Sequence, residues 1–354
     1  MQSSKIRLGV LCGGRSSEHE ISLRSAANVL RAVDRTRYDV IVVGIDRAGG
    51  WQIVSENALA SKELLPVGKG AAYRAESLAG ALPILMTCDV IFPVLHGKMG
   101  EDGTMQGFLR VLDLPFIGAD VAGSAVGMDK WLMKRLLVEA GLPIGRYTAF
   151  RDVQSATANF ATLRERFGMP LYVKPAAQGS SVGVHRVENE TDFRSAVEDA
   201  LRYDDVVLVE EAIAGREVEC AVLGNEEPIA SLCGEIIPKG GFYSYENKYL
   251  NEDGAAFEMP ANLPGHVMDR LRKLAIETYR ALDCAGLARV DFFLRPDESI
   301  IINEINTLPG FTSISMYPKL FELSGLPTPQ LIDRLVHLAR DRHVKQTAKK
   351  IDRV

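Results

Sequence analysis

Four side chains that suit metal and phosphate chemistry occur close together near the end of the sequence. Arg289 and Asp291 belong to a run in which apolar residues alternate with others, as in a β-strand. Glu304 and Asn306 end a second run that is rich in β-branched residues, and their spacing of two puts them on one face of a strand. Pro296 and its neighbours supply turn chemistry between the runs. The sequence therefore predicts two strands joined by a tight turn.

The expected turn sets the register of the two strands. If it is centred just after Asp297, Asp291 lies opposite Glu304, and Arg289 lies opposite Asn306. Opposed residues have Cβ atoms about 4.5–5.5 Å apart, so two carboxylates would repel each other unless a cation lay between them. Oxygen ligands without His or Cys suit Mg²⁺ or Mn²⁺. The alternative is a solvated hairpin end that carries a chance pair of acids.

Length and composition indicate a soluble globular protein of two or three domains. The chain has 354 residues, of which 25% are charged and 47% hydrophobic. Its net charge of -5 gives no general attraction to nucleic acid or to an anionic membrane. No stretch approaches the roughly 18 apolar residues of a membrane span, and the N-terminus lacks the layout of a signal peptide. Five scattered cysteines without a CxxC pair favour a reducing, cytoplasmic setting.

The first part of the chain has the pattern of a β-α-β unit, so we expect a parallel sheet with a right-handed crossover. The expected elements are a strand at Ile6–Leu11, a helix that ends near Val33 and a strand at Val40–Ile45. The unit lacks G-x-G-x-x-G, which disfavours a nicotinamide-dependent enzyme. Glu18 and Glu20 occur where the helix starts, near the positive end of its dipole. Helix capping alone would account for one of these acids.

A further strand, Asp89–Leu95, runs into a glycine-rich loop that begins at His96. Ligands of open α/β sheets bind at the carboxyl ends of the strands, so we expect this loop to line a site. The residue type leaves two roles open for His96, a structural turn residue or a catalytic one.

The second part of the chain pairs a lysine and a small-residue loop with later acids. A helix at Asp129–Ala140 precedes a strand at Pro170–Lys174, and a Gly/Ser loop follows at Gln178–Gly183. Such a loop lets backbone N–H groups approach an anion, although an ordinary hairpin connection is the alternative. There is no P-loop motif. The strand Val206–Glu210 ends in acids, and Glu217 follows. These acids suit an adenine amino group and a ribose, but surface acids are also common.

The rest of the chain includes a polar and aromatic segment, Pro238–Pro260, that is too polar for a core strand. Long ordered loops of this type often close over sites, and we therefore interpret the segment as a lid. The alternative is a surface loop without a role.

Six motifs, in this order, resemble the D-alanine–D-alanine ligase family of the ATP-grasp superfamily: HGKMGEDGTMQG, GMDK, VKPAAQGSSVGV, ENKYL, ARVDFFL and NEINTLPGFTSISMYP. The likeness covers nearly the whole chain, from GGRSSEHEIS to beyond Tyr317. Many ATP-grasp enzymes share VKP or EIN alone. The string EINTLPGFTS, together with HGxxGEDG and SEHEIS, is much more specific.

The resemblance implies an α/β chain, α+β overall, with the ATP-grasp fold. An N-terminal Rossmann-like parallel-sheet domain, residues 1–126, would cover the amino-acid substrate. A central domain, residues 127–214, and a C-terminal domain, residues 215–354, would hold ATP between them, with the lid at 238–260. The family also suggests a homodimer.

The resemblance also assigns residues to the nucleotide and its metal ions. Lys130 and Lys174 would contact phosphates, Glu210 the adenine amino group and Glu217 the ribose. The full set placed around ATP is Lys130, Lys174, Ser181, Val182, Gly183, Glu210, Glu211, Ile213, Glu217 and, on the lid, Lys248. Asp291, Glu304 and Asn306 would hold two Mg²⁺ (or Mn²⁺) ions that neutralise the phosphates.

The family's reaction has two steps. The carboxylate of one D-alanine attacks the γ-phosphate of ATP, and the amine of a second D-alanine then attacks the resulting acyl phosphate. Glu18 would hold the first ammonium group, linked to Ser180 and Tyr249. The residues that would act on the second step are Arg289 and the N–H of Gly310, at the oxyanion, and Ser315, at the second carboxylate.

Three alternatives follow from the same residues. Related ligases take D-serine or D-lactate as the second substrate, and Tyr249 and Met316 resemble the D-alanine type. Another ATP-grasp ligase would join a different carboxylate to a different amine. A catalytically silent nucleotide-binding module would not need the oxyanion donor Arg289.

Overall fold

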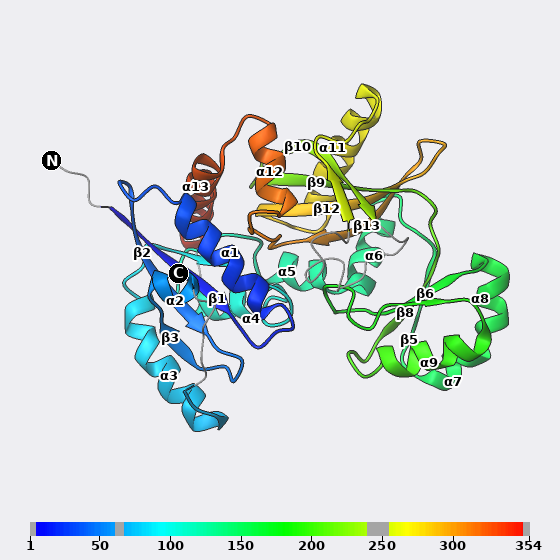
Figure 1. The fold of residues 1–354 in the computed structure, drawn as a ribbon, viewed down its shortest axis with the longest axis horizontal. Coiled ribbons are helices and arrows are strands. Elements are labelled where there is room, and N and C mark those ends of the chain that lie inside the picture. Colours follow the sequence, from blue (N-terminus) through cyan, green and yellow to red (C-terminus); the bar gives the residue numbers. More distant parts are fainter. Residues whose placement is uncertain (1–4, 61–66, 239–254, 350–354) are drawn as a thin grey trace.

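The computed structural model describes residues 5–60, 67–238 and 255–349. In these ranges the chain forms three sheets, arranged as a parallel-sheet unit, a small antiparallel sheet and a larger antiparallel sheet (Figure 1). Lys248 and Tyr249, which the resemblance places on the lid, lie outside the described residues.

The first sheet has the strand order β3-β2-β1-β4. Strand β1 is parallel to both β2 and β4, as the β-α-β pattern predicts, whereas β3 adds an antiparallel edge that was not predicted. The strands are β1 (Ile6–Gly13), β2 (Tyr38–Ile45), β3 (Trp51–Ile53) and β4 (Val90–Pro93). The helices of this part are α1 (His19–Ala32), α2 (Glu56–Ala60), α3 (Gly70–Leu85), α4 (Thr104–Val111) and α5 (Val121–Met128).

The second sheet has the order β5-β8-β6-β7, with all neighbours antiparallel. Helices α7, α8 and α9 cover one face and bury phenylalanines against it. The strands are β5 (Tyr147–Phe150), β6 (Leu171–Pro175), β7 (His185–Val187) and β8 (Val207–Glu211). The helices are α6 (Lys130–Glu139), α7 (Val153–Ala158), α8 (Phe160–Phe167) and α9 (Glu190–Ala200).

The third sheet has the order β11-β10-β9-β12-β13 and is antiparallel throughout. The strands are β9 (Arg216–Gly224), β10 (Ile229–Pro238), β11 (Ala255–Glu258), β12 (Gly286–Leu294) and β13 (Ile300–Asn306). The helices are α11 (Gly265–Ala281), α12 (Met316–Leu323) and α13 (Thr328–Thr347). Helix α13 returns to the first sheet, and its buried face shares one core with β1 and α1 (Figure 1).

The hairpin of β12 and β13 confirms the predicted pairing of the polar residues. Asp291 lies opposite Glu304, and Arg289 lies opposite Asn306. The predicted position of the turn was wrong by half a residue. At the turn itself Leu294 pairs with Ile300, which centres the turn on residue 297. The pairing beside the turn and the pairing of the polar residues are offset by one residue, because a β-bulge follows Ile302 on β13.

The bulge decides which face of the sheet each residue of β13 occupies. Ile302 and Ile305 are both buried in the core under α11, although they are three positions apart. A regular strand alternates faces and would put them on opposite sides. The extra residue therefore shifts the alternation, so that Glu304 and Asn306 leave the apolar face and join Asp291 on the other.

Candidate active site

Helix α6 positions two lysines between the second and third sheets. Trp131 packs against the second sheet, whereas Met133 and Leu137 are buried in the core of the third sheet. The helix starts where the carboxylate of Asp129 accepts hydrogen bonds from the N–H groups of Trp131 and Leu132, at 2.9 and 3.0 Å. Residues at spacing i, i+4 share one face of a helix, so Lys130 and the lysine four residues later point the same way.

Three nearly buried lysines meet two carboxylates at this place. Lys130 Nζ lies 3.2 Å from Glu304 Oε2. Lys174 Nζ and Lys134 Nζ lie 2.7 and 3.1 Å from the two oxygens of Glu210. Three ammonium groups against two carboxylates leave one net positive charge in this cluster. Arg289, Asp291 and Glu219 adjoin Glu304 and bring the total to four cations and four carboxylates, so the lysines form the positive side of a site that is neutral overall.

The pKa values report how strongly these charges interact. Burial alone would raise the pKa of Glu210, but the charges of Lys134 and Lys174 hold it at about 2. Burial lowers the pKa of Lys174, and Lys134 and Lys130 add to that effect against the opposing charge of Glu210. Glu210 is therefore a fixed anion at neutral pH.

We predict that Lys134→Met lowers the free energy of unfolding at pH 7 by about 3 kcal/mol, because it leaves Glu210 nearly buried with one cation instead of two. The low folded-state pKa of Glu210 stabilises the fold above pH 4.5, the ordinary value for Glu, and this stabilisation is lost as the pH falls toward 2. In the variant this pKa rises. The stability gap between the two proteins should therefore shrink over that pH range, as measured by urea unfolding.

The matched control for this test is Lys273→Met, which breaks the exposed pair of Lys273 with Glu277. Exposed pairs contribute little, so this variant should match the unchanged protein at every pH. A stability gap for Lys134→Met that stays constant between pH 7 and 2 would contradict the assigned coupling.

The hairpin of β12 and β13 forms the opposite wall, with one partly buried arginine at its centre. Arg289 donates to both oxygens of Asp291, through Nε and Nη2, at 2.7 Å each. Its Nε also lies 3.0 Å from Glu219 Oε2, on β9. Asn306 Nδ2 donates to Asp291 at 3.0 Å. Burial alone would lower the pKa of Arg289, but Asp291 and Glu219 raise it well above its ordinary value. The guanidinium therefore stays charged.

The Gly/Ser loop is both a hairpin connection and a tightly curved backbone. Strands β6 and β7 pair on either side of it, which agrees with the simpler interpretation of the sequence. Ser180, Ser181 and Gly183 all have positive φ, at 52°, 58° and 69°. Two serines in this region are strained, and such strain clusters at functional sites. The loop is tied to the lysine cluster because Lys130 Nζ donates to the carbonyl of Gln178 at 3.0 Å.

Glu18 reaches from the first sheet toward this loop. Its side chain is buried, and it makes no cap hydrogen bond although it begins α1. A Cβ on Gly97 would lie 2.8 Å from Glu18 Oε2, and one on Gly179 would lie 3.5 Å from it. The carboxylate therefore lies between two glycines, beside Ser180. Glu20, in contrast, forms an exposed ion pair with Arg47.

A loop between β13 and α12 carries Gly310 and Ser315. A Cβ on Gly310 would lie 2.8 Å from Ser315 Oγ, so the two residues are adjacent. Ser315 Oγ accepts from the N–H of Thr312 at 3.0 Å. Helix α1 holds the same loop, because Ser25 Oγ accepts from the N–H of Phe311 at 3.2 Å.

His96 belongs to the support of that loop. Its Nδ1 lies 3.1 Å from the carbonyl of Leu308, and its Nε2 lies 2.9 Å from Ser25 Oγ. Burial alone would lower the pKa of His96, but Glu101 raises it above its ordinary value. Of the two roles left open by the sequence, these contacts describe a residue that ties the first sheet to the loop of Gly310.

The sequence analysis missed two functional candidates, Lys134 and Glu219, and it left the role of His96 open without naming its partners. Lys134 could have been found from the sequence, since it follows Lys130 by four residues on a predicted helix. Glu219 could have been found as well, because it follows Glu217 by two residues on a strand. The bonds of His96 span more than 70 residues in sequence and left no local signal.

Some predicted nucleotide residues have other partners in the structure. Glu211 accepts from Arg146 Nε and Nη2, at 2.8 and 2.6 Å. Ile213 packs against Gly145, where a Cβ would lie 2.8 Å from its Cδ1. Glu217 lies opposite Phe293 on β12. It precedes Glu219 by two residues, on the same face of β9.

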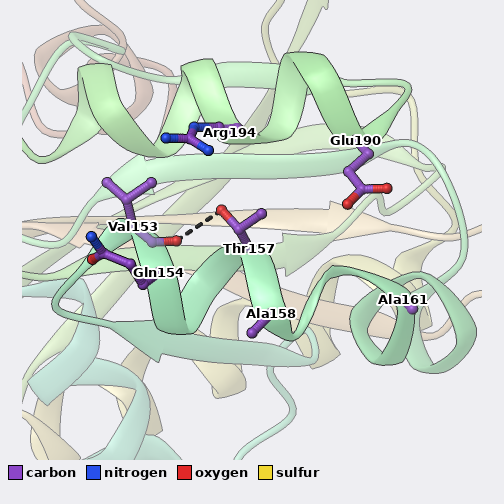
Figure 2. A pocket seen from close by; sticks show the side chains of 7 residues that line it. All are labelled: Val153, Gln154, Thr157, Ala158, Ala161, Glu190 and Arg194. Atoms are coloured by element: carbon purple, nitrogen blue, oxygen red, sulfur yellow. Dashed lines mark hydrogen bonds between the residues drawn. The ribbon is translucent and has the colours of Figure 1, made fainter.

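A separate hollow of about 510 Å³ opens on the helices of the second sheet, away from these residues. Figure 2 shows its walls, with Thr157 donating to the carbonyl of Val153 across one turn of α7. Arg194, on the opposite wall, pairs with Glu198 at 2.9 Å. The hollow contains none of the predicted site residues.

The junction of the second and third sheets thus has buried lysines on one side and carboxylate and amide oxygens on the other, with a parallel-sheet domain beside it. This architecture is that of an ATP-grasp enzyme.

The chain belongs to the D-alanine–D-alanine ligase family. Residues 7–119 match the family model for the D-ala D-ala ligase N-terminus, and residues 136–337 match the model for its C-terminus. A D-alanine–D-alanine ligase of Oceanobacillus iheyensis is 48% identical over 362 residues, which cover 99% of each chain.

Two solved structures are similar over nearly the whole chain. The D-alanine–D-alanine ligase of Coxiella burnetii has a TM-score of 0.82 and 37% identity, with 98% of this chain and 97% of that chain covered. The VanG D-Ala:D-Ser ligase of Enterococcus faecalis has a TM-score of 0.81 and 32% identity, with 95% and 100% covered.

These similarities confirm the resemblance and the α/β ATP-grasp fold predicted from the motifs. The chain is an ATP-dependent ligase. In the part of the chain that the structure describes, no helix is long and apolar enough to cross a membrane.

Proposed function

We propose that the chain joins two D-alanine molecules into D-alanyl-D-alanine, with ATP converted to ADP and phosphate, for peptidoglycan precursor synthesis. The 48% identity to a D-alanine–D-alanine ligase supports the reaction. The single structural observation that carries it is the junction in which Lys130 contacts Glu304 while Arg289 holds Asp291 on the adjacent strand. This junction combines cations for a triphosphate with ligands for a metal and a donor for an oxyanion.

The nucleotide binds between the second and third sheets in this proposal. Lys130 and Lys174 contact its phosphates, and the backbone of Ser181 to Gly183 covers them. Glu210 accepts from the adenine amino group while it keeps its lysines, since a carboxylate has about four acceptor positions. The positive side that the lysine cluster gives to the site supports this placement. Glu211 at the end of β8, Ile213 in the connection after it and Glu217 on β9 complete the adenine and ribose site.

The oxygen donors of the hairpin fit one or two divalent cations. Asp291 and Glu304 lie opposite each other, and Asn306 adds an amide on the same face. Magnesium takes few protein carboxylates and completes its shell with water and phosphate, which matches this small set. Two Mg²⁺ (or Mn²⁺) ions bound here would neutralise charge on the β- and γ-phosphates. Asn306 would turn its amide oxygen toward them.

In the first step, an oxygen of the first D-alanine's carboxylate forms a bond to the γ-phosphorus, and the bond from that phosphorus to ADP breaks. The product is D-alanyl phosphate. Glu18 holds the ammonium group of this substrate beside Ser180, consistent with the position of its carboxylate next to Gly179. Lys248 and Tyr249 complete the site in this proposal, on a lid that excludes water from the acyl phosphate.

In the second step, the neutral amine of the second D-alanine attacks the activated carbonyl. The amine loses a proton, and the tetrahedral intermediate collapses with loss of phosphate. Arg289 and the N–H of Gly310 stabilise the oxyanion. Ser315 receives the carboxylate of the second substrate, and its contact with Gly310 supports a shared site for the two roles.

ADP release with D-alanine, L-alanine, D-serine and D-lactate tests this function. We expect release with D-alanine alone and with none of the other three compounds alone. D-Serine or D-lactate added together with D-alanine should not appear in the product, measured by mass spectrometry. A mixed product would instead favour the second-substrate specificity named for the VanG relative. No ADP release with D-alanine would refute the proposal.

The domain boundaries 1–126, 127–214 and 215–354, a homodimer and a cytoplasmic location are also proposed. The boundaries are supported by the three separate sheets. Light scattering of the purified chain would measure its oligomeric state.

A further inference from the structure

A cavity of about 310 Å³ lies at the carboxyl edge of the first sheet, lined in part by the loop that follows β4, including His96. Its walls come from the end of β1, the turn before β3, one face of α3 and the loop after β4. The mechanism proposed above uses no side chain from α3 or β3. Ligands of open α/β sheets bind at this edge, so the position suits a small molecule.

Two arginines converge over one glycine on the rim of this cavity. A Cβ on Gly49 would lie 2.8 Å from Cδ of Arg15 and 2.8 Å from Cδ of Arg74. Gly49 has a φ of +87°, so a side chain there would also be strained. The structure thus holds two guanidinium stems side by side. Lys98 also lines the cavity, but its Nζ donates to the carbonyl of Tyr203 at 2.8 Å, outside the lining.

The lining includes no acid among the described residues. The carboxylate of the nearby Asp46 is occupied, because it accepts from the N–H groups of Ala48 and Gly50 and from the hydroxyl of Tyr73. Like charges held together repel each other unless an anion joins them. Arginine pairs bind carboxylates and phosphates with two parallel hydrogen bonds each.

The inner surface of the cavity is apolar. Trp51 lines it, and Leu78, Leu95 and Met105 complete its floor. Trp51 contacts Phe108 at 5.5 Å between ring centroids, which fixes the indole in place. A flat apolar group would fill this floor while an acidic group met the arginines at the rim.

We propose that this cavity binds a small organic anion, a carboxylate or phosphate on a flat apolar body, and that its occupancy changes the affinity for the first D-alanine. The predicted change in D-alanine affinity rests on the proposed function. The coupling runs through Ser16, which lines the cavity and whose Oγ accepts from the N–H of Glu18 at 3.0 Å. A ligand that moves this loop moves the carboxylate that holds the first ammonium group.

Isothermal titration of the full chain with 2-naphthoate tests the binding site without any reaction. It is done with saturating ADP and magnesium, which occupy the nucleotide site. We expect saturable binding, with 2-naphthamide at least about tenfold weaker because it lacks the charge. Equal affinity for the acid and the amide, or no saturable binding, would overturn the proposal.

Variants locate the probe within the cavity. The double change Arg15→Gln and Arg74→Gln should weaken 2-naphthoate at least about tenfold. Leu78→Trp should weaken it by filling the floor while both arginines remain. Arg334→Gln, an exposed arginine on α13, is the matched control and should leave binding unchanged. Thermal melts check that each variant folds. Unchanged affinity in the double variant and in Leu78→Trp would place the probe elsewhere and refute the site.

The coupling is measured as the KM for D-alanine in ADP release, with and without 2-naphthoate. We expect a change of at least about threefold in the unchanged protein and in Arg334→Gln, and none in the double variant. A constant KM would refute the coupling. If D-alanine supports no ADP release, the proposed function fails, while the calorimetric result still decides the cavity.

Discussion

Replacing Glu304 by glutamine is expected to lower kcat by about 10²- to 10⁴-fold, a larger effect than the loss of stability caused by breaking its pair with Lys130. In the proposed mechanism this carboxylate binds a metal ion that stabilises charge in phosphoryl transfer, a contribution of several kcal/mol. Glutamine keeps the size of the side chain and an oxygen, but not the charge. The change also leaves Lys130, 3.2 Å away, without its anion. Steady-state ADP release over a range of magnesium concentrations measures the effect.

The matched control is Glu298→Gln on the turn of the same hairpin. Glu298 pairs with His266 at the surface, so its loss should leave kcat unchanged and stability within about 0.5 kcal/mol. Unfolding in urea separates a catalytic effect from a folding effect in both variants. Unaltered turnover and magnesium dependence in Glu304→Gln would remove this residue from the metal site.

The second large effect is expected for Arg289→Lys, which should block peptide formation more than acyl phosphate formation. Lysine keeps a positive charge near Asp291 and Glu219 but cannot reproduce the planar fork that holds both. The loss of one oxyanion donor costs about 10²–10³ in rate. Hydroxylamine intercepts acyl phosphates, so the ratio of trapped hydroxamate to dipeptide should rise in this variant.

Arg216→Lys is a suitable comparison, because Arg216 also pairs with a buried carboxylate, Glu235, on the same sheet but outside the proposed site. It should lose some stability without any change in the ratio of hydroxamate to dipeptide. A fall in both products together for Arg289→Lys would show that the arginine serves the first step. The oxyanion assignment would then be wrong.

Sequence reasoning predicted the local part of this site well. The structure confirms the facing pairs Asp291–Glu304 and Arg289–Asn306, although the turn lies half a residue from its predicted place and an unpredicted bulge sets the register of both pairs. The parallel pairing of β1 and β2 was also predictable, since a short helical crossover permits little else. Such features depend on residues that are close in sequence.

The remaining features of the site depend on distant contacts. The lysine pair on Glu210 brings together α6, β6 and β8. Glu219 meets Arg289 only because β9 pairs with β12. No periodicity or motif gives the order of strands in a sheet, and the third sheet joins elements in the order β11-β10-β9-β12-β13. The unpredicted edge strand β3 is three residues long, which is too short for a pattern.

The bulge after Ile302 makes β13 a strand with two halves in opposite phase. The turn-side half sends its even-numbered residues, Ile300 and Ile302, into the core, and the far half sends its even-numbered residues, Glu304 and Asn306, onto the opposite face. The same sequence paired regularly from the turn, without the bulge, would keep every candidate metal ligand. It would nevertheless present Ile305 to the nucleotide and bury a carboxylate under α11. The spacing of the ligands is therefore necessary but not sufficient, and one residue that binds nothing sets the side on which the chemistry occurs.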